Sequence, residues 1–305
     1  MGQFSPISDR ATRAEGPGPI VDRSDRGRCD PVNPVITGDK AQWPFSRTAA
    51  PRHAREVQTS ASKEPTGPPA SEATSSPTAV EAACRVVLLG GMFSTELGID
   101  LGKGERELTR WFLAAMLFGT RISATIAMRT FSVLDKTGVT VASARHASWD
   151  ALVELLDAGG YTRYDYRTAT RLQALSEVLD TRYGGRVSAI AHQARTSAEL
   201  EAALDALPGW GPVTVGVFLR ELRGVWDLAD PPLGALAADA GRHLQVLSRG
   251  GALEQLRAVA TTAGIDVRDL ECALVRLALA HHRRFADCPG GRRCAVLAGL
   301  APVGS

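Results

Sequence analysis

The pattern of apolar and polar positions predicts helices along the chain from residue 105 onward. In residues 105–118, apolar side chains recur every three or four positions, which is the spacing of one face of an amphipathic helix. The same spacing predicts helices over residues 122–134, 149–158, 164–183, 197–207, 212–223, 235–247, 252–263 and 267–284. Residues suited to the N-caps of three of these helices are Ser148, Ser197 and Asp266. No sustained alternation of period two appears after residue 90, so we expect an all-α fold.

A turn rich in glycine and proline separates two of these helices. The helices at 197–207 and 212–223 flank the sequence Leu207-Pro208-Gly209-Trp210-Gly211-Pro212-Val213-Thr214. Glycines two positions apart let the backbone approach a partner closely, and a proline suits the first turn of the second helix. The N–H groups at a helix start favour an anion, so we expect a phosphate to bind at this turn.

The N-terminal part of the chain has a different composition. Residues 1–83 hold 11 of the 17 prolines together with many serines and threonines. Such a segment buries too little apolar surface to offset the entropy cost of ordering, so we expect residues 1–90 to be disordered. An alternative is that translation begins at Met92, close to the start of the helical pattern. We expect one helical domain over residues 91–295, followed by a tail over 296–305.

The net charge and the cysteine content limit which functions and which cellular locations are compatible with the sequence. The formal net charge is +2, so a nucleic-acid partner would have to be met by a local basic patch. Five sparsely spaced cysteines do not form the framework of a disulfide-rich secreted domain. The sequence shows no signal-peptide pattern and no apolar run of transmembrane length, so we expect a cytoplasmic monomer that does not bind membranes.

The turn and its surroundings resemble the helix-hairpin-helix (HhH-GPD) DNA glycosylases, the superfamily that includes endonuclease III. The segment from Leu207 to Gly211 matches the family's hairpin. Asp230 follows it where the family places a catalytic Asp, in a loop that is one residue shorter than the loop of endonuclease III. The segment 160–169 and the helix pair at 111–128 are similar to further family segments, so the likeness covers residues 93–295. It implies a two-lobed helical bundle that binds double-stranded DNA, acts in base excision repair and associates with the nucleoid.

Asp230 is the candidate catalytic residue. Cleavage of an N-glycosidic bond passes through an oxocarbenium-like sugar, which a carboxylate can stabilise while water attacks. The alternatives are that Asp230 caps a helix or fills a turn, or that nearby Asp227 takes the catalytic role. Family members that also nick DNA carry a lysine inside the hairpin, where this chain has Val213, and no lysine follows Lys136. The resemblance therefore implies a monofunctional hydrolase without Schiff-base chemistry.

Contacts to DNA are expected from the hairpin and from basic side chains near it. The predicted set is Leu207, Gly209, Trp210, Gly211, Val213, Thr214, Arg121 and Arg220. Arg121 or Ile122 stands where the family inserts a wedge into the duplex, unless this stretch is an ordinary helix–helix turn. Further residues, which suit phosphates or stacked bases but equally suit salt bridges and packing, are Arg223, Arg163, Arg167, Arg171, Tyr161, Tyr164 and Tyr166.

The C-terminal cysteines match half of an iron–sulfur motif. Many endonuclease III relatives carry C-x6-C-x2-C-x5-C, and Cys288 and Cys294 have the last of these spacings. The other two positions hold Ala278 and Phe285. A four-iron cluster needs four thiolates, so we expect neither a cluster nor another cofactor, and two free thiols in a frayed tail. The alternative is a zinc site that adds His281 or His282.

Two other functions are compatible with the sequence. One is a non-catalytic helix-hairpin-helix module that binds DNA without excising a base. The other is a helical protein–protein interaction domain, which the near-neutral net charge allows. Binding to duplex DNA separates the glycosylase and the binding module from the protein–protein interaction domain. Release of a free base then separates the glycosylase from the binding module.

Overall fold

The computed structural model describes residues 76–300, and this part of the chain is helical and contains no β-strand. The helices are α1 (Pro77–Val86), α2 (Phe93–Glu96), α3 (Glu105–Phe118), α4 (Ala124–Lys136), α5 (Trp149–Gly159), α6 (Asp165–Tyr183), α7 (Ser188–Gln193), α8 (Ser197–Asp205), α9 (Pro212–Arg220), α10 (Ala235–His243), α11 (Ala252–Ala263), α12 (Val267–Ala280) and α13 (Ala295–Ala298). Short 3₁₀ helices lie at Val87–Leu89, Ala144–His146 and Gly291–Arg293. The predicted all-α class is confirmed.

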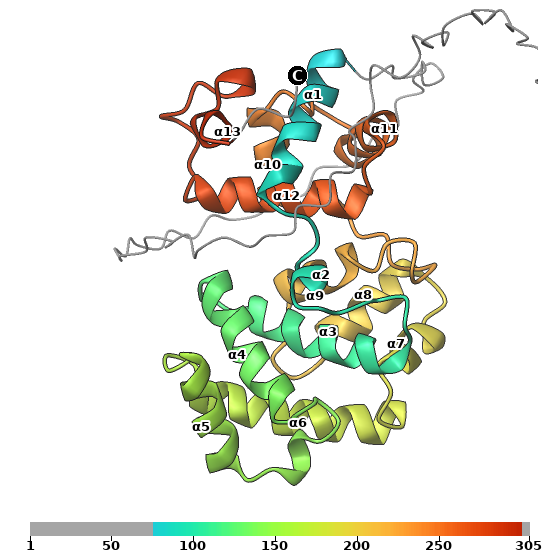
Figure 1. Cartoon of the computed structure of the whole chain (residues 1–305). Helices are drawn as coiled ribbons and strands as arrows, with labels where there is room; N and C mark the ends of the chain where they lie inside the picture. The colour runs from blue at the N-terminus through green and yellow to red at the C-terminus, as the bar shows by residue number, and fades with distance from the viewer. Residues whose placement is uncertain (1–75, 301–305) are drawn as a thin grey trace, which may run out of the picture.

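The helices are arranged in two lobes (Figure 1). Helices α3 to α9 form one lobe, in which α4 packs against α3 and α5, α5 packs against α6, and α9 packs against α3 and α8. Helix α12 is the centre of the other lobe and packs against α1, α10 and α11. The first and last described helices therefore lie in the same lobe, although more than two hundred residues separate them.

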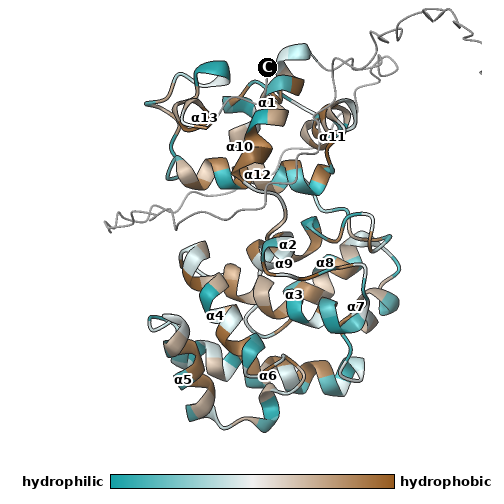
Figure 2. Cartoon of the chain, viewed as in Figure 1, coloured by the Kyte–Doolittle hydropathy of each residue, from teal (hydrophilic) through white to brown (hydrophobic). Residues whose placement is uncertain are grey.

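An aromatic cluster ties α3 to the turn between α8 and α9. The fully buried Trp111 donates from Nε1 to the carbonyl oxygen of Phe218 at 3.1 Å. Phe112 stacks on Trp210 with 4.3 Å between ring centroids and meets Phe218 edge-on at 5.3 Å. The longer helices carry both apolar and polar residues (Figure 2), as expected when one face is buried. The hairpin therefore packs on one side against the hydrophobic core of its own lobe.

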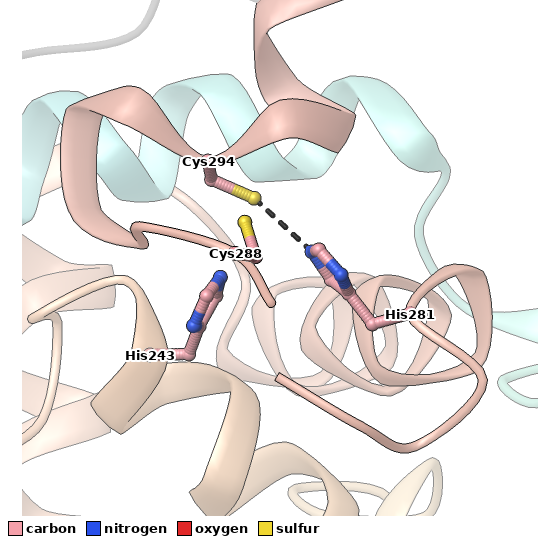
Figure 3. A group of neighbouring side chains, drawn as sticks. All are labelled: His243, His281, Cys288 and Cys294. Atoms are coloured by element: carbon pink, nitrogen blue, oxygen red, sulfur yellow. Dashed lines mark hydrogen bonds between the residues drawn. The ribbon is translucent and has the colours of Figure 1, made fainter. Parts of the chain in front are cut away.

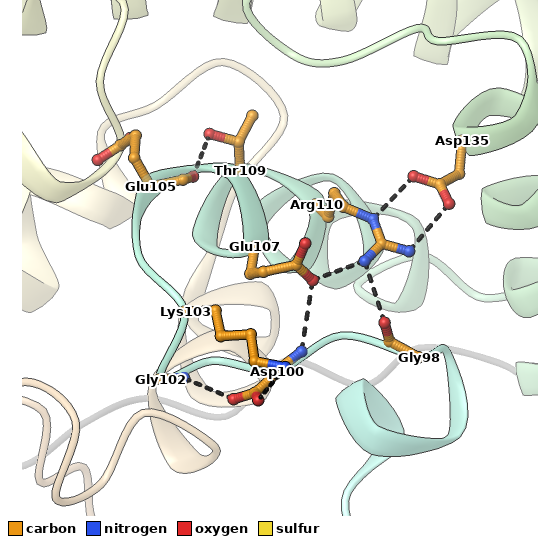
Figure 4. Close-up of polar contacts among 9 residues, drawn as sticks. All are labelled: Gly98, Asp100, Gly102, Lys103, Glu105, Glu107, Thr109, Arg110 and Asp135. Carbon is orange, nitrogen blue, oxygen red and sulfur yellow. Dashed lines mark hydrogen bonds and ion pairs between the residues drawn. The ribbon is translucent and has the colours of Figure 1, made fainter.

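A polar network on the other side of α3 joins this helix to α4 (Figure 4). Arg110 donates to both carboxylate oxygens of Asp135 at 2.8 and 2.9 Å, and to Glu107 at 2.6 Å. The same guanidinium donates to the carbonyl oxygen of Gly98 at 3.1 Å. Because planar, bidentate pairs with arginine are directional, this network sets the orientation of α3 relative to α4 and to the chain before α3.

Local capping signals explain several helix starts. Ser148 accepts a hydrogen bond from Ala151 N at 3.2 Å, and Asp266 accepts one from Arg268 N at 2.8 Å, so these two predicted caps are confirmed. The predicted cap Ser197 is instead the first residue of α8. Thr196 is the cap, and its hydroxyl accepts from Glu199 N at 3.1 Å.

The predicted boundary of the N-terminal segment is wrong at its end. Residues 77–86 form α1, whose buried face includes Val80, Ala83 and Val86 and packs against α11 and α12. The prediction for the chain before residue 76 lies outside the described residues. The stretch Pro77–Glu96 is long and apolar enough to cross a membrane by length and composition alone. Gly90 interrupts it with φ 111°, and most of its apolar side chains pack in or against the core, whereas Leu88 is exposed.

Candidate functional site

The turn between α8 and α9 is a tight hairpin whose backbone is exposed on one side. Trp210 N donates to Leu207 O at 3.0 Å and closes the turn, and Leu207 is buried. Gly209 has φ +83°, a conformation that side chains rarely adopt. A Cβ at this position would also lie 2.8 Å from Cδ of Arg171, so the stem of Arg171 runs directly along the hairpin.

The first turn of α9 presents N–H groups without acceptors. Gly211 is the N-cap residue and offers no side chain, and Pro212 begins the helix. Within residues 76–300, no backbone carbonyl and no side chain accepts from the N–H groups of Val213 and Thr214. A Cβ at Gly211 would meet no atom within 4 Å, and Val213 is 68% exposed. Open N–H groups at the positive end of a helix dipole form a site for an anion.

The turn between α3 and α4 lies against this hairpin. A Cβ on Gly119 would be 2.9 Å from Cβ and 3.3 Å from Cα of Thr214, so the two backbones approach closely. Tyr161 supports the turn from below, because its buried hydroxyl donates to Leu117 O at 3.1 Å and hydrogen-bonds Thr120. Burial raises the pKa of Tyr161 to about 12. Tyr161 is fully buried and therefore has the packing role, one of the two roles considered for it.

Basic side chains without acidic partners surround the hairpin. Arg121 is exposed in the turn after Gly119, and Arg171 lies beside Gly209 with Arg167 one helical turn before it. Burial lowers the pKa of Arg171, and the charge of Arg167, which lies one helical turn before it on α6, lowers it further. No carboxylate among the described residues forms an ion pair with these three arginines. They form a local basic patch on a nearly neutral chain.

Arg220 and Arg223 are not part of this patch. Arg220 ends α9, nine residues after Gly211, so a rise of 1.5 Å per residue places it roughly 13 Å away along the helix. Its guanidinium lies 5.5 Å from the ring centre of Phe93, and its Nε is buried without a hydrogen-bond partner among the described residues. Arg223 is 5% exposed. The phosphate role considered for Arg223 is wrong because its guanidinium is inside the protein.

Asp230 lies in the segment that connects the two lobes. Its Oδ1 accepts hydrogen bonds from Arg223 and from Arg257 of α11. Arg223 in turn donates to Glu271 of α12 at 3.2 and 3.3 Å. Burial raises the pKa of Asp230, but the hydrogen bonds from Arg257 and Arg223 lower it by more, so its pKa is below the usual value. The carboxylate is thus ionised, fixed in position and 44% exposed. The competitor Asp227 is exposed and forms no ion pair with any described residue.

Glu221, two residues before Arg223, is a fully buried carboxylate that also joins the lobes. Glu221 accepts from Phe93 N at 3.1 Å and from Ser94 N at 2.9 Å, which places its charge at the start of α2. The thiol of Cys272 on α12 donates to the same carboxylate at 3.3 Å. Sequence spacing offered no signal for these partners, because they come from separate segments that meet only in the folded protein.

Four side chains able to ligate a metal converge in the second lobe (Figure 3). His243 ends α10, His281 follows α12, and Cys288 and Cys294 lie in the loop before α13. One ligand atom of each residue lies within 4.8 Å of the ligand atoms of the other three. Cys294 is fully buried, so the predicted frayed tail is wrong. The zinc alternative named His281 and both cysteines, but it missed His243 and considered His282, which is not in the group.

The titration behaviour of this group follows from its surroundings. Burial lowers the pKa of His243 and of His281, and a nearby second histidine lowers each pKa further. Burial raises the pKa of Cys294. Burial also acts to raise the pKa of Cys288, but hydrogen bonds from Ala295 N and Gly290 N outweigh it and bring the pKa below the usual value.

The described residues therefore offer two separate chemistries. The hairpin with its basic patch can bind a phosphate backbone, and a fixed carboxylate stands at the junction of the lobes. The His/Cys group can bind a metal ion.

No protein-family model and no curated protein sequence matches the chain. Functional assignment thus depends on the geometry of these residues and on the resemblance of the hairpin.

Proposed function

We propose that this protein binds duplex DNA through the α8–α9 hairpin and hydrolyses the N-glycosidic bond of a damaged or mismatched base, as a monofunctional helix-hairpin-helix glycosylase. The observation that carries the proposal is the first turn of α9. Its N–H groups at Val213 and Thr214 have no acceptor among the described residues. The half-buried Arg171 lies beside Gly209, and the exposed Arg121 lies in the turn that packs against Thr214. Backbone N–H groups and arginines are the donors that hold DNA phosphates.

Asp230 supplies the chemistry in this proposal. An ionised carboxylate stabilises positive charge that develops on the sugar as the base departs. The pKa of Asp230 is lowered, so the group is anionic at neutral pH, and only Oδ1 is engaged by the two arginines. Water is the nucleophile, because the hairpin position that would hold a Schiff-base lysine is Val213. Asp230 follows the hairpin helix in the segment that connects the two lobes, at the position where the resemblance implies a catalytic carboxylate.

The binding half of the proposal is tested with Val213→Glu. Val213 is exposed, so the change leaves the core intact, and it places a carboxylate beside the proposed phosphate. Two unit charges 4 Å apart repel by about 1 kcal/mol in water, so we expect Kd for a duplex to rise about fivefold. The added negative charge should also make the salt dependence of Kd shallower, because it offsets part of the arginine charge that releases counterions from DNA. Fluorescence anisotropy on a labelled duplex measures both, with Val213→Thr as the neutral control of similar shape.

An unchanged Kd and salt slope for Val213→Glu would refute DNA binding by the hairpin. That result would favour a protein–protein interaction domain. A fall in affinity for Val213→Thr of the same size would show that the hairpin fold, and not the added charge, was perturbed.

The catalytic half is tested with Asp230→Asn. This change keeps the shape of the side chain and removes its charge, so single-turnover release of a free base should fall by about 100-fold or more while duplex binding persists. Asp227→Asn is the control, because Asp227 is exposed and close in sequence. Duplexes with deaminated, oxidised, alkylated and mismatched bases form the panel, and release is measured by chromatography.

A non-catalytic DNA-binding module is the second candidate, and one observation favours it. Both Arg223 and Arg257 already donate to Asp230, which partly neutralises the charge that catalysis requires. If the unmodified protein binds duplexes but releases no base from any member of the panel, the module is the correct function. Equal release by Asp230→Asn and the unmodified protein would instead exclude Asp230 as the catalytic group.

A further inference from the structure

We propose that His243, His281, Cys288 and Cys294 bind one tetrahedral zinc ion that fastens the C-terminal loop to its lobe. The four side chains come from three segments that are separate in sequence. Their ligand atoms all lie within 4.8 Å of one another. Zinc bonds of about 2.0–2.3 Å in a tetrahedron require ligand atoms roughly 3.3–3.8 Å apart, so only small adjustments bring all four to one ion.

One nitrogen of the group lacks the hydrogen-bond partner that a buried polar atom normally has. Nε2 of His243 is buried and has no hydrogen-bond partner in the described part of the chain. Figure 3 shows the His243 and His281 rings and both sulfur atoms directed toward one another. His281 Nε2 lies 3.2 Å from Cys294 Sγ. A buried, unpaired imidazole nitrogen is costly, and a metal ion at the centre of the group would satisfy it.

The surroundings of the group support ligation. Ala295 N donates to Cys288 Sγ at 3.3 Å, and such a hydrogen bond stabilises a thiolate ligand. The ring of Phe285 covers the histidines from one side, stacking on His243 with 4.5 Å between centroids and lying 5.1 Å from His281. An apolar wall of this kind excludes water from a metal site.

The donor set favours zinc over iron–sulfur chemistry. Two thiolates and two imidazoles in a tetrahedron are a common structural zinc set. A four-iron cluster takes four thiolates, each on a different iron, and its ligands stand on separate corners of the cluster and not around one point. All four positions here are filled by protein side chains, so no position is left open for a substrate, and the role is structural and not catalytic.

Zinc at this position would order the loop that carries both cysteines. Gly290 in this loop lies directly on α10, since a Cβ there would be 2.5 Å from His243 O, and its φ is +69°. The polar contacts that hold the loop are an exposed ion pair of Arg292 with Glu81 and a hydrogen bond from Arg85 to Leu297 O at 2.7 Å. Exposed pairs contribute little, so the metal would add a strong fastening to the packing of Cys294 and Leu297, which are buried in the core.

Metal analysis of the purified full-length protein tests the proposal. We expect about one zinc per chain, and less than about 0.1 after Cys294→Ser or His243→Ala. The matched controls are Cys272→Ser, whose thiol contacts Glu221 outside the group, and His192→Ala, whose imidazole is exposed on α7, and both should keep full zinc content. Chelation should lower the Tm of the unmodified protein and of both controls.

Cobalt provides a second readout that does not depend on the variants folding. The chelated, unmodified protein loaded with Co²⁺ should show the intense visible absorption of a tetrahedral sulfur-ligated ion, and added zinc should abolish it. Absence of zinc together with absence of this cobalt spectrum would overturn the proposal. Broad visible absorption with stoichiometric iron would overturn it in favour of a cluster. Neither outcome bears on DNA binding, so this test is independent of the proposed function.

Discussion

Substitution of Arg223 is the most direct test of how the two lobes are joined and how Asp230 is positioned. Arg223→Met removes the guanidinium but keeps a long apolar side chain of similar length. The change leaves Glu271 buried at 3% exposure without its hydrogen-bond donor. Arg220 contributes a neighbouring positive charge to this region, but no hydrogen bond to Glu271.

The expected loss of stability in Arg223→Met follows from how deeply its two partners, Glu271 and Asp230, are buried. Removing one partner from a buried ion pair costs about 3–5 kcal/mol, because the other charge remains in a poorly solvated place. The bond to Asp230 adds little, roughly 0–1 kcal/mol, since that carboxylate is 44% exposed. At roughly 2–4 °C per kcal/mol for a domain of this size, a total loss of about 3–6 kcal/mol should lower Tm by roughly 6–24 °C.

Glu271→Met should cost less than Arg223→Met, and the pair of single variants therefore shows an asymmetry. In Glu271→Met, Arg223 keeps its hydrogen bond to Asp230, whereas in Arg223→Met, Glu271 keeps no donor. The double variant should recover most of the loss, because well-packed apolar side chains replace buried ion pairs at little cost. Urea unfolding of all four proteins gives the free energies and the coupling term.

Arg195→Met is the matched control for this series. Arg195 makes the same type of pair with Glu199, but on the surface, where its side chain is 86% exposed, so its loss should be about 0.5 kcal/mol or less. A loss in Arg223→Met no larger than in this control would refute the reasoning. A double variant less stable than Arg223→Met alone would also refute it, because Glu271 would then stabilise the protein without its partner.

Three further predictions concern the hairpin, the pH dependence and the lobe junction. Gly119→Ala should lower both Tm and duplex affinity, because the new methyl group would lie 2.9 Å from Cβ of Thr214, and thermal melting and anisotropy on one sample check this. Asp230→Asn should be less stable than the unmodified protein at pH 7. The folded-state pKa of Asp230 is lowered, so its contribution to stability is present above the unfolded value of about 3.9 and is lost as pH falls through the folded value. Urea unfolding at pH 7 and at pH 3 should therefore show a smaller difference between the two proteins in acid. Glu221→Gln should cost about 1.5–3 kcal/mol by chemical denaturation, because charged hydrogen bonds to the start of α2 become neutral ones, and a cost below 0.5 kcal/mol would argue against a buried carboxylate there.

Helices with strong local signals were predictable to the residue. The helices at 105–118 and 252–263 have the predicted bounds, since one apolar face and flanking glycines define them locally. Other ends shifted, for example α12 stops at Ala280 and not at 284. Helix α1 was missed because its short apolar face follows a proline- and serine-rich stretch, and it gains stability only by packing against α11 and α12.

Some site residues were recognisable from the local sequence, and others were brought together only by the fold. The glycines and Pro212 of the hairpin were recognisable because they act through backbone conformation, which is a property of the local sequence. Arg220 was predicted to join them, but helix geometry places it near Phe93. His243 gave no signal beside the cysteines, because it lies in a different helix and meets them only in three dimensions.

The sequence by itself determined the helical class, the open turn at Gly209 and Gly211, and the absence of a lysine in the hairpin. These depend on neighbours three or four residues apart, on single backbone conformations and on composition. Only the tertiary structure decided which charges face each other. Asp230 between Arg223 and Arg257, and the two histidines beside the two cysteines, result from packing of segments that are distant in the chain, and local periodicity contains no information about that packing.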